Sequence, residues 1–258
     1  MKRQIDAVIF DMDGLIIDSE PLWKIAEIET FKEVGFDFTI EMCALTTGMR
    51  IDEVVEFWRK KLKWQNFTNI EIVDKIQNKM IQLIQENAKL LPGVMESLNL
   101  LKANDVLIAL ASSSSMSLIN ATVDTLKIRE FFNIIHSAEN EIAGKPNPAV
   151  FLSTAKMLEV QPNKCLVLED SKAGMNAGIN ASMRTIVIPE FGTSPKWANN
   201  AYKKLKTNNA GTVSAKLDYA QVLEKPAMTK PISGEVKKEL KDLNDTLGFF
   251  EPDGVLDD

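Results

Sequence analysis

Short apolar runs recur along the chain and are separated by stretches with helical periodicity. Rich in Val, Ile and Leu, they cover residues 7–10, 106–111, 132–135, 165–168 and 185–188. Their apolar positions are continuous rather than alternating, which is typical of strands buried on both faces of a parallel sheet. The pattern therefore predicts an α/β fold in which helices flank a parallel sheet of five strands.

The stretches between these runs supply the helices that cover such a sheet. Apolar residues recur at helical spacing at Val94, Leu98 and Leu101, and again at Leu118, Ile119, Thr122, Val123 and Leu126. Each set forms a stripe that can be buried against one face of the sheet.

Roughly ninety residues with little strand character separate the first apolar run from the second, far more than one crossover connection needs. Residues 23–34 and 51–62 have the pattern of amphipathic helices, and a further apolar stripe consists of Ile72, Ile76, Met80, Leu83 and Ile84. Proline and glycine at residues 91–93 mark the return to the sheet. We predict a core domain, residues 1–18 and 91–225, into which a helical domain, residues 19–90, is inserted.

The composition changes near Lys225, beyond which lie Pro226, Pro231, Pro252 and Gly254. We therefore predict a C-terminal extension, residues 226–258. A possible helix within it has an apolar stripe formed by Val236, Leu240, Leu243 and Leu247. We favour packing of this helix on its own domain, and the alternative is an element that binds a partner.

The overall composition is that of an ordinary globular protein. The 258 residues are 45% hydrophobic and have a formal net charge of −6, which argues against a general affinity for nucleic acid. We find no signal peptide and no apolar stretch near the ~20 residues that a membrane span needs. The only cysteines, Cys43 and Cys165, do not indicate an oxidising compartment. We expect a cytoplasmic protein, a monomer or weak homodimer, with neither membrane nor nucleic acid as partner.

Acidic side chains follow two of the apolar runs. Asp11 and Asp13 come directly after the first run, and residues two apart in an extended chain project to the same side. Gly14 permits a tight turn at the carboxyl end of the strand, where open parallel sheets bind ligands. The same residues taken alone are also compatible with an ordinary turn or a calcium loop.

Glu169 and Asp170 follow the fourth run in the same way. Four carboxylates at one sheet edge repel one another unless a cation neutralises them, and oxygen ligands of this kind favour Mg²⁺ over zinc or copper. The alternative for this second pair is that it caps the next helix.

Two further signals suit the binding of a phosphate group. Ser112, Ser113 and the two serines after them end the second run at a helix start, where hydroxyl and amide groups can bind phosphate oxygens. Lys145 lies in a loop stiffened by Pro146 and Pro148. Each signal alone also fits an unremarkable surface loop, but their order along the chain predicts a site for phosphoryl transfer.

This order resembles that of the haloacid-dehalogenase-like phosphatases. Their four motifs are represented by residues 11–14, Ser112, Lys145 and residues 169–170, and the resemblance covers about residues 5 to 190. Residues 10–23, 47–52 and 91–94 further resemble the bacterial hexose- and hexitol-phosphate phosphatases of the 2-deoxyglucose-6-phosphatase type, close to the β-phosphoglucomutase-like group. The resemblance implies a Rossmann-like core with the helical insert as its cap.

The resemblance also implies an activity, the hydrolysis of a small phosphorylated metabolite with Mg²⁺ as cofactor. Hexose, 2-deoxyhexose or hexitol 6-phosphates are the implied substrates. Asp11 is then the nucleophile that forms an aspartyl phosphate, and Asp13 is the general acid and base. Ser112 and Lys145 take part in catalysis and, together with Ser113, bind the phosphate group.

The implied metal ligands are Asp11, Asp13 through its backbone carbonyl, and Asp170, with assistance from Glu169. In the cap, Arg50 and Glu20 are the implied substrate-binding residues; Arg50 taken alone is equally compatible with a solvated surface charge.

Three other functions compete with this one. A β-phosphoglucomutase-like enzyme shares the core motifs but has a histidine early in the cap, where this sequence has Trp23; its only histidine is His136. Haloacid dehalogenases lack the second aspartate of the Asp-x-Asp pair. A binding protein without catalytic activity is the third alternative, because a fold alone does not fix function, and the intact acidic and lysine motifs weigh against it.

Overall fold

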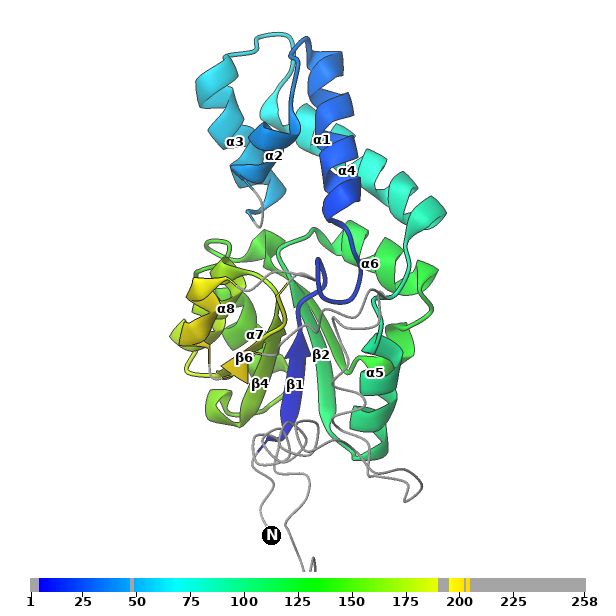
Figure 1. Ribbon diagram of the computed structural model, residues 1–258, viewed down its shortest axis with the longest axis vertical. Coiled ribbons are helices and arrows are strands. Elements are labelled where there is room, and N and C mark those ends of the chain that lie inside the picture. The colour runs from blue at the N-terminus through cyan, green and yellow to red at the C-terminus, as the bar shows by residue number, and fades with distance from the viewer. Residues whose placement is uncertain (1–4, 47–48, 190–194, 202, 205–258) are drawn as a thin grey trace, which may run out of the picture.

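The computed structural model describes residues 5–46, 49–189, 195–201 and 203–204. Figure 1 shows a sheet flanked by helices, with a second group of helices above the sheet. The C-terminal extension predicted for residues 226–258, with its apolar stripe, lies outside the described residues.

The sheet of the described residues has six strands in the order β3-β2-β1-β4-β5-β6, and all neighbouring pairs are parallel. The strands are β1 (Ala7–Phe10), β2 (Leu107–Ser112), β3 (Ile134–Ser137), β4 (Cys165–Glu169), β5 (Arg184–Val187) and β6 (Lys203–Lys204). The five predicted strands are confirmed, although several of their ends differ by one or two residues. The sequence analysis missed β6, because two lysines at a sheet edge carry no apolar signal.

Helices cover both faces of this sheet. The helices are α5 (Val94–Ala103), α6 (Met116–Thr125), α7 (Ala149–Met157) and α8 (Lys172–Asn180). Side chains of α5 and α6 share one buried cluster with Val8 and Phe10 of β1, while side chains of α7 and α8 share another with Ala7 and Ile9. The predicted stripes on α5 and α6 are buried, apart from a partly buried Leu126 just after α6. Single 3-10 turns lie at Arg129–Phe131, Ala138–Asn140, Pro162–Lys164 and Lys196–Asn200.

The helices above the sheet are α1 (Glu20–Val34), α2 (Ile40–Ala44), α3 (Ile51–Leu62) and α4 (Asn69–Asn87). A capping box formed by Thr68 and Glu71 begins α4, and Gly35, with a φ of 97°, ends α1. The predicted stripe of α4 is buried and belongs to one cluster with aromatic rings of the cap, including the stacked pair Phe31 of α1 and Phe38 of the segment before α2.

The two chain segments that join these helices to the sheet run side by side. Ile17 and Leu90 form an antiparallel bridge, and the Leu91 N–H donates to the Ile16 carbonyl at 2.8 Å. These two segments lie at the boundaries that the sequence predicts for an inserted domain. The division into a core and a cap stays a prediction, and "cap" below denotes residues 19–90.

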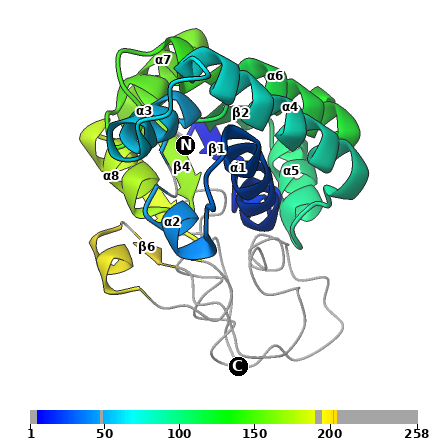
Figure 2. The ribbon, with the colours of Figure 1, turned by 90° about the horizontal axis from the view of Figure 1, so that it is seen from above.

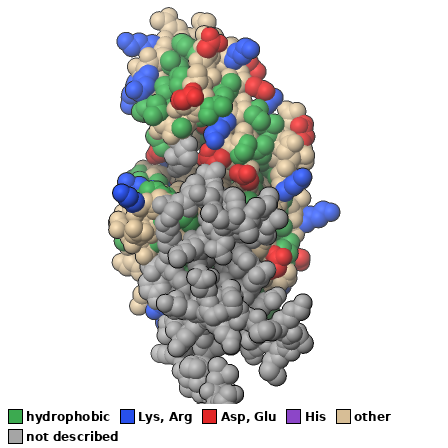
Figure 3. Space-filling view, in the orientation of Figure 1, with side chains coloured by type: hydrophobic (Ala, Val, Ile, Leu, Met, Phe, Trp, Pro, Cys, Tyr) green, Lys and Arg blue, Asp and Glu red, His purple; other side chains and the backbone are tan. Residues whose placement is uncertain are grey.

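The cap lies over the carboxyl ends of the central strands, as Figures 1 and 2 together show. Helix α4 also packs against α6 of the core. On the face seen in Figure 3, basic and acidic side chains of the described cap residues are interspersed, so that no broad field of one sign covers it. None of the described helices is long and apolar enough to span a membrane.

Candidate active site

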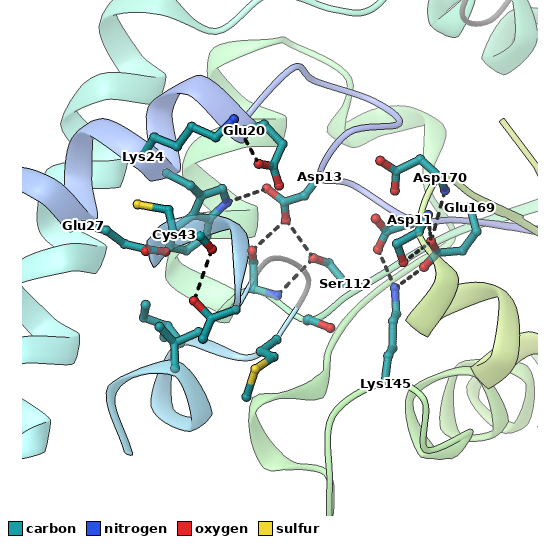
Figure 4. A pocket seen from close by; sticks show the side chains of 18 residues that line it. Asp11, Asp13, Glu20, Lys24, Glu27, Cys43, Ser112, Lys145, Glu169 and Asp170 are labelled. Atoms are coloured by element: carbon teal, nitrogen blue, oxygen red, sulfur yellow. Dashed lines mark hydrogen bonds and ion pairs between the residues drawn. The ribbon is translucent and has the colours of Figure 1, made fainter. Parts of the chain in front are cut away.

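The carboxyl ends of β1, β2 and β4 converge beneath the cap. Phe10 is in register with Leu110 and Leu168, so the residues that follow these positions lie at one edge of the sheet. A pocket of about 840 Å³ of empty space, part of it open to solvent, lies between this edge and the cap (Figure 4).

Lys145 joins two acidic residues at the buried end of this pocket. Its Nζ donates to Asp11 Oδ1 at 2.5 Å and to Glu169 Oε1 at 2.7 Å. Burial alone would lower the pKa of Lys145, but the two carboxylates outweigh burial and raise the pKa above its usual value. Burial raises the pKa of Asp11, the Lys145 ammonium opposes this shift, and the carboxylates of Glu169 and Asp13 reinforce it.

The Glu169 carboxylate also fixes the loop that follows β4. Its Oε2 accepts from the backbone N–H groups of Asp170 and Ser171, at 3.1 and 3.0 Å, and from the Ser171 hydroxyl at 2.9 Å. Both of its oxygens therefore have donors within the protein. Ser171 in turn caps α8, because its hydroxyl accepts from the Gly174 N–H. Glu169, predicted as a metal ligand, therefore also helps to fix the start of α8.

The donor set at this edge fits a hard divalent cation. Oxygen atoms of Asp11, Glu169 and Asp170 lie within 4.8 Å of one another, and the Lys145 ammonium is paired with two of these residues, Asp11 and Glu169. Three carboxylates against one ammonium leave an excess of negative charge that Mg²⁺ would neutralise. Gly14, with a φ of 72°, lies against Asp170. A β-carbon at this position would collide with the Asp170 carboxylate, so the site requires glycine here.

The Asp13 carboxylate lies apart from this acidic cluster and faces the cap. Its Oδ1 accepts from the Ser19 hydroxyl at 2.6 Å and from the Trp23 indole at 3.1 Å. Its Oδ2 accepts from the hydroxyls of Ser114, at 2.8 Å, and Ser112, at 3.4 Å. Figure 4 shows the Asp13 carboxylate beside Ser112, one of these donors. Asp11 and Asp13 thus belong to one pocket but have separate partners.

The serine run after β2 lines the same pocket. Ser112, Ser113 and Ser114 all contribute to its wall, and the Ser114 N–H donates to the Ser112 hydroxyl at 3.0 Å. The Ser137 hydroxyl of β3 donates to the Ser114 carbonyl at 2.6 Å and thereby helps to fix the serine loop. Hydroxyl groups and Lys145 therefore meet on one side of Asp11.

The two predicted cap residues differ in their placement. Glu20 lines the pocket and forms an ion pair with Lys24, with 3.7 Å between its Oε2 and the Lys24 Nζ. Arg50 is not among the described residues that line the pocket. Its Nη1 instead donates to the carbonyls of Ala138, at 3.1 Å, and Glu141, at 3.0 Å, on the core. In this arrangement Arg50 links cap to core rather than contacting the pocket.

Several pocket residues were not predicted from the sequence as site residues. Trp23 and Ser114 contact Asp13, while Glu27 and Cys43 form part of the cap wall. Burial raises the pKa of Glu27 to about 7; the Cys43 thiol, which hydrogen-bonds the carboxylate, opposes this shift and the Glu20 charge adds to it. Glutamates in an amphipathic helix normally face solvent, so the sequence gives no sign that Glu27 is buried.

Comparisons with known proteins identify the family of this chain. The family of haloacid dehalogenase-like hydrolases matches residues 8–188. Hexitol phosphatase B of Escherichia coli (strain K12) is 41% identical over 188 residues, which cover 72% of this chain and 85% of that protein. β-Phosphoglucomutase of Bacillus subtilis (strain 168) is 31% identical over 188 residues, which cover 70% of this chain and 82% of that one.

Among solved structures, CbbY from Rhodobacter sphaeroides in complex with phosphate is similar with a TM-score of 0.72 and 26% identity. The match covers 78% of this chain and 93% of that chain. The parallel sheet, the acidic strand ends and the match over residues 8–188 agree, and the chain is therefore an enzyme that belongs to the haloacid dehalogenase-like hydrolase family.

Proposed function

We propose that this enzyme is a Mg²⁺-dependent phosphatase that hydrolyses small sugar phosphates, namely hexose, 2-deoxyhexose or hexitol 6-phosphates. One observation carries the proposal: the buried Asp11 is paired with Lys145 in the pocket that also holds the hydrogen-bonded Asp13. A nucleophile, a cation for the phosphate group and a second carboxyl for proton transfer are what phosphate ester hydrolysis requires.

In the first step, a carboxylate oxygen of Asp11 attacks phosphorus. A bond forms between that oxygen and phosphorus, and the bond from phosphorus to the ester oxygen breaks. Asp13, protonated at this stage, gives its proton to the departing alkoxide, which leaves as an alcohol. Lys145 and the hydroxyl of Ser112 bind the non-reacting phosphate oxygens, together with Ser113, and stabilise their charge in the transition state.

In the second step, water cleaves the aspartyl phosphate. Asp13, now ionised, takes a proton from the water as its oxygen attacks phosphorus. The bond between phosphorus and Asp11 breaks, inorganic phosphate leaves and both carboxyl groups return to their starting states. Splitting one displacement into two lowers the barrier of each. The donors from Ser19, Trp23 and Ser114 hold Asp13 where both transfers take place.

Asp11, Asp170 and the backbone carbonyl of Asp13 are the ligands we assign to Mg²⁺. The ion, when bound, screens the repulsion between the carboxylates and the phosphate and polarises the phosphoryl group. Since both oxygens of Glu169 already have donors, we assign Glu169 to the placement of Lys145 and of the Asp170 loop.

The substrate class is supported by the E. coli relative named hexitol phosphatase B and by two charged side chains in the cap wall. Glu20 and Lys24 line the pocket on the cap side, where the leaving group would lie. Closure of the cap over the core excludes bulk water and selects the leaving group.

The second candidate is a phosphomutase, supported by the Bacillus subtilis relative. Such an enzyme returns the phosphoryl group to a second hydroxyl instead of to water. Trp23 favours hydrolysis, because the mutases have a histidine early in the cap, and at about that position this chain has Trp23, whose indole N–H donates to Asp13. His136 belongs to β3 and pairs with Glu141, with 2.7 Å between its Nε2 and Oε1 of that residue, and it does not line the pocket.

The test is phosphate release by the purified protein over a panel of sugar, sugar-alcohol, nucleotide and glycolytic phosphates with Mg²⁺. Preferential release from hexose or hexitol 6-phosphates, abolished by Asp11→Asn and by EDTA, would support the proposal. Isomerisation of glucose 1-phosphate to glucose 6-phosphate without phosphate release would establish the mutase instead. No turnover of either kind would refute both.

A further inference from the structure

The pocket has a second acidic wall, at the end away from Asp11. Glu27 of α1 lines the pocket, its residue is 6% exposed, and its Oε2 has no hydrogen-bond partner among the described residues. A buried carboxylate oxygen without a donor lowers stability. Most buried polar side-chain atoms in proteins have a hydrogen-bond partner, so an unpaired carboxylate oxygen in a pocket wall points to a ligand that supplies the donor.

The surroundings of Glu27 define what a ligand must supply. The Cys43 thiol of α2 hydrogen-bonds the carboxylate. On the cap side of the pocket, Lys24 is the one cation among the described lining residues, and it is paired with Glu20. The rest of the cap wall is formed mainly by the neutral side chains Trp23, Thr46, Met49, Ile51 and Val54.

The order of groups along the pocket gives the orientation of a substrate. In Figure 4, Asp13 is drawn between the end that holds Asp11 and Lys145 and the end that holds Glu27. A phosphate group at Asp11 and Lys145 thus places the ester oxygen near Asp13. The remainder of the leaving group then extends toward Glu27.

We propose that Glu27 accepts a hydrogen bond from a hydroxyl of the leaving group, and that it selects esters of uncharged polyhydroxylated alcohols over esters whose leaving group carries a second anion. A carboxylate accepts readily from hydroxyl groups and repels anions. A site built to bond a hydroxyl also rejects analogues that lack it, because its own polar group is then left unpaired. The inference rests on the proposed phosphatase function.

The test uses two substrates that differ at one carbon and a third without sugar hydroxyls. Glucitol 6-phosphate ends in a hydroxymethyl group, 6-phosphogluconate ends in a carboxylate at the same carbon, and p-nitrophenyl phosphate has neither. The variants are Glu27→Gln and Glu27→Leu. Glu33→Gln is the matched control on the same helix, since Glu33 is exposed and pairs with Lys75.

The assay is run with Mg²⁺ at pH 8, above the pKa of about 7 to which burial raises Glu27. We expect Glu27→Leu to lower kcat/KM for glucitol 6-phosphate by roughly 10- to 100-fold. Turnover of p-nitrophenyl phosphate should stay within about threefold of wild type, which also shows that the variant is folded and the core site intact. In both variants the preference for glucitol 6-phosphate over 6-phosphogluconate should fall by at least about tenfold, and the control should keep it.

Three results with the variants would overturn the inference. The first is an unchanged preference in both variants, and the second is an equal loss for all three substrates. The third is failure of both variants to fold, which would make Glu27 a structural residue. A wild type that releases phosphate from p-nitrophenyl phosphate but not from glucitol 6-phosphate would also reject the inference while leaving phosphatase activity intact. Only failure with every substrate would reject the proposed function itself.

Discussion

At the scale of single residues, the contacts of Asp13 link the cap to the chemistry. The indole N–H of Trp23 donates to the Asp13 carboxylate across 3.1 Å, and Trp23 belongs to the first turn of a cap helix while Asp13 follows a core strand. A hydrogen bond to a charged group contributes about 1.5–3 kcal/mol. The position of α1 therefore influences how Asp13 is held.

Trp23→Phe should remove this donor and little else. Because the Asp13 carboxylate is then less well held, we expect kcat for a hexitol phosphate to fall roughly tenfold. Steady-state kinetics against wild type measure the effect. The matched control is Trp64→Phe, because the buried Trp64 indole N–H has no hydrogen-bond partner in the part of the chain that the structure describes, and its loss should leave kcat unchanged. Equal effects of the two substitutions would contradict a role for Trp23 at Asp13.

Glu27 gives a prediction for the pH dependence of stability. Its pKa in the folded protein is raised from 4.5 to about 7, chiefly by burial, so the folded state binds more protons than the unfolded state between these values. Stability must therefore fall as pH rises from about 4.5 to 7, by at most about 3 kcal/mol in total. Glu27→Gln cannot ionise and escapes this loss.

We accordingly expect Glu27→Gln to melt several degrees above wild type at pH 8, with most of the difference gone at pH 5. Thermal denaturation at the two pH values is the measurement. Glu33→Gln, which removes an exposed carboxylate, should give no gain that depends on pH in this way. A Glu27→Gln protein less stable than wild type at pH 8 would show that the carboxylate is well satisfied in the folded state.

At the scale of elements, the sequence was most informative about the sheet. Runs such as residues 165–168 are apolar throughout because β4 is buried on both faces, and this signal is local. The strand signal also predicted that Asp11, Ser112 and Glu169 lie at one edge of the sheet, because the carboxyl ends of parallel strands lie on the same side. In contrast, the short helix α2 and the two-residue strand β6 give too few residues for periodicity to detect.

The cap wall could not be predicted because it depends on how helices pack against one another. Periodicity shows that α1 is a helix, but the contact of Glu27 with Cys43 of α2 depends on how the two helices pack. Arg50 illustrates the same limit. Its sequence position resembles that of a substrate-facing residue, yet its guanidinium bonds two carbonyls that only the tertiary structure brings near.

The start of α3, which Arg50 precedes, joins cap and core through a second contact. Glu53 of α3 accepts from the Gly144 N–H at 3.4 Å, next to Lys145. We therefore expect Arg50→Ala to favour the open cap and to raise KM for a hexitol phosphate roughly tenfold. Acetyl phosphate, whose leaving group is too small to reach the cap wall, should be hydrolysed at nearly the wild-type rate.

Arg59→Ala is the matched control for this prediction. Arg59 also donates to a backbone carbonyl, that of Phe67 at 3.0 Å, but both residues belong to the cap. It should leave KM for both substrates unchanged. If Arg50→Ala impaired acetyl phosphate as strongly as the hexitol phosphate, Arg50 would act on the phosphate group and not on cap closure.

At the scale of the whole molecule, the acidic edge predicts a coupling between metal binding and stability. The excess of carboxylates around Lys145 destabilises the folded state, and a bound cation removes this repulsion. A ligand that binds only the folded state at 100 times its Kd adds about 2.7 kcal/mol of stability. For a domain of this size that corresponds to a rise in Tm of roughly 5–10 °C.

We therefore expect MgCl₂ to raise the Tm of the EDTA-treated protein by this amount, and Asp170→Asn to remove most of the rise. Without metal, Asp170→Asn should be at least as stable as wild type, because it loses one charge from a repulsive cluster. Asp74→Asn makes the same chemical change at an exposed position of α4 and should keep the full response. If MgCl₂ raised the Tm of Asp170→Asn as much as that of the wild type, Asp170 would not be a ligand of the ion. If Mg²⁺ left the Tm of the wild type unchanged, the ion would not bind at this site. Lys145 and protonation would then be what neutralises the acidic cluster.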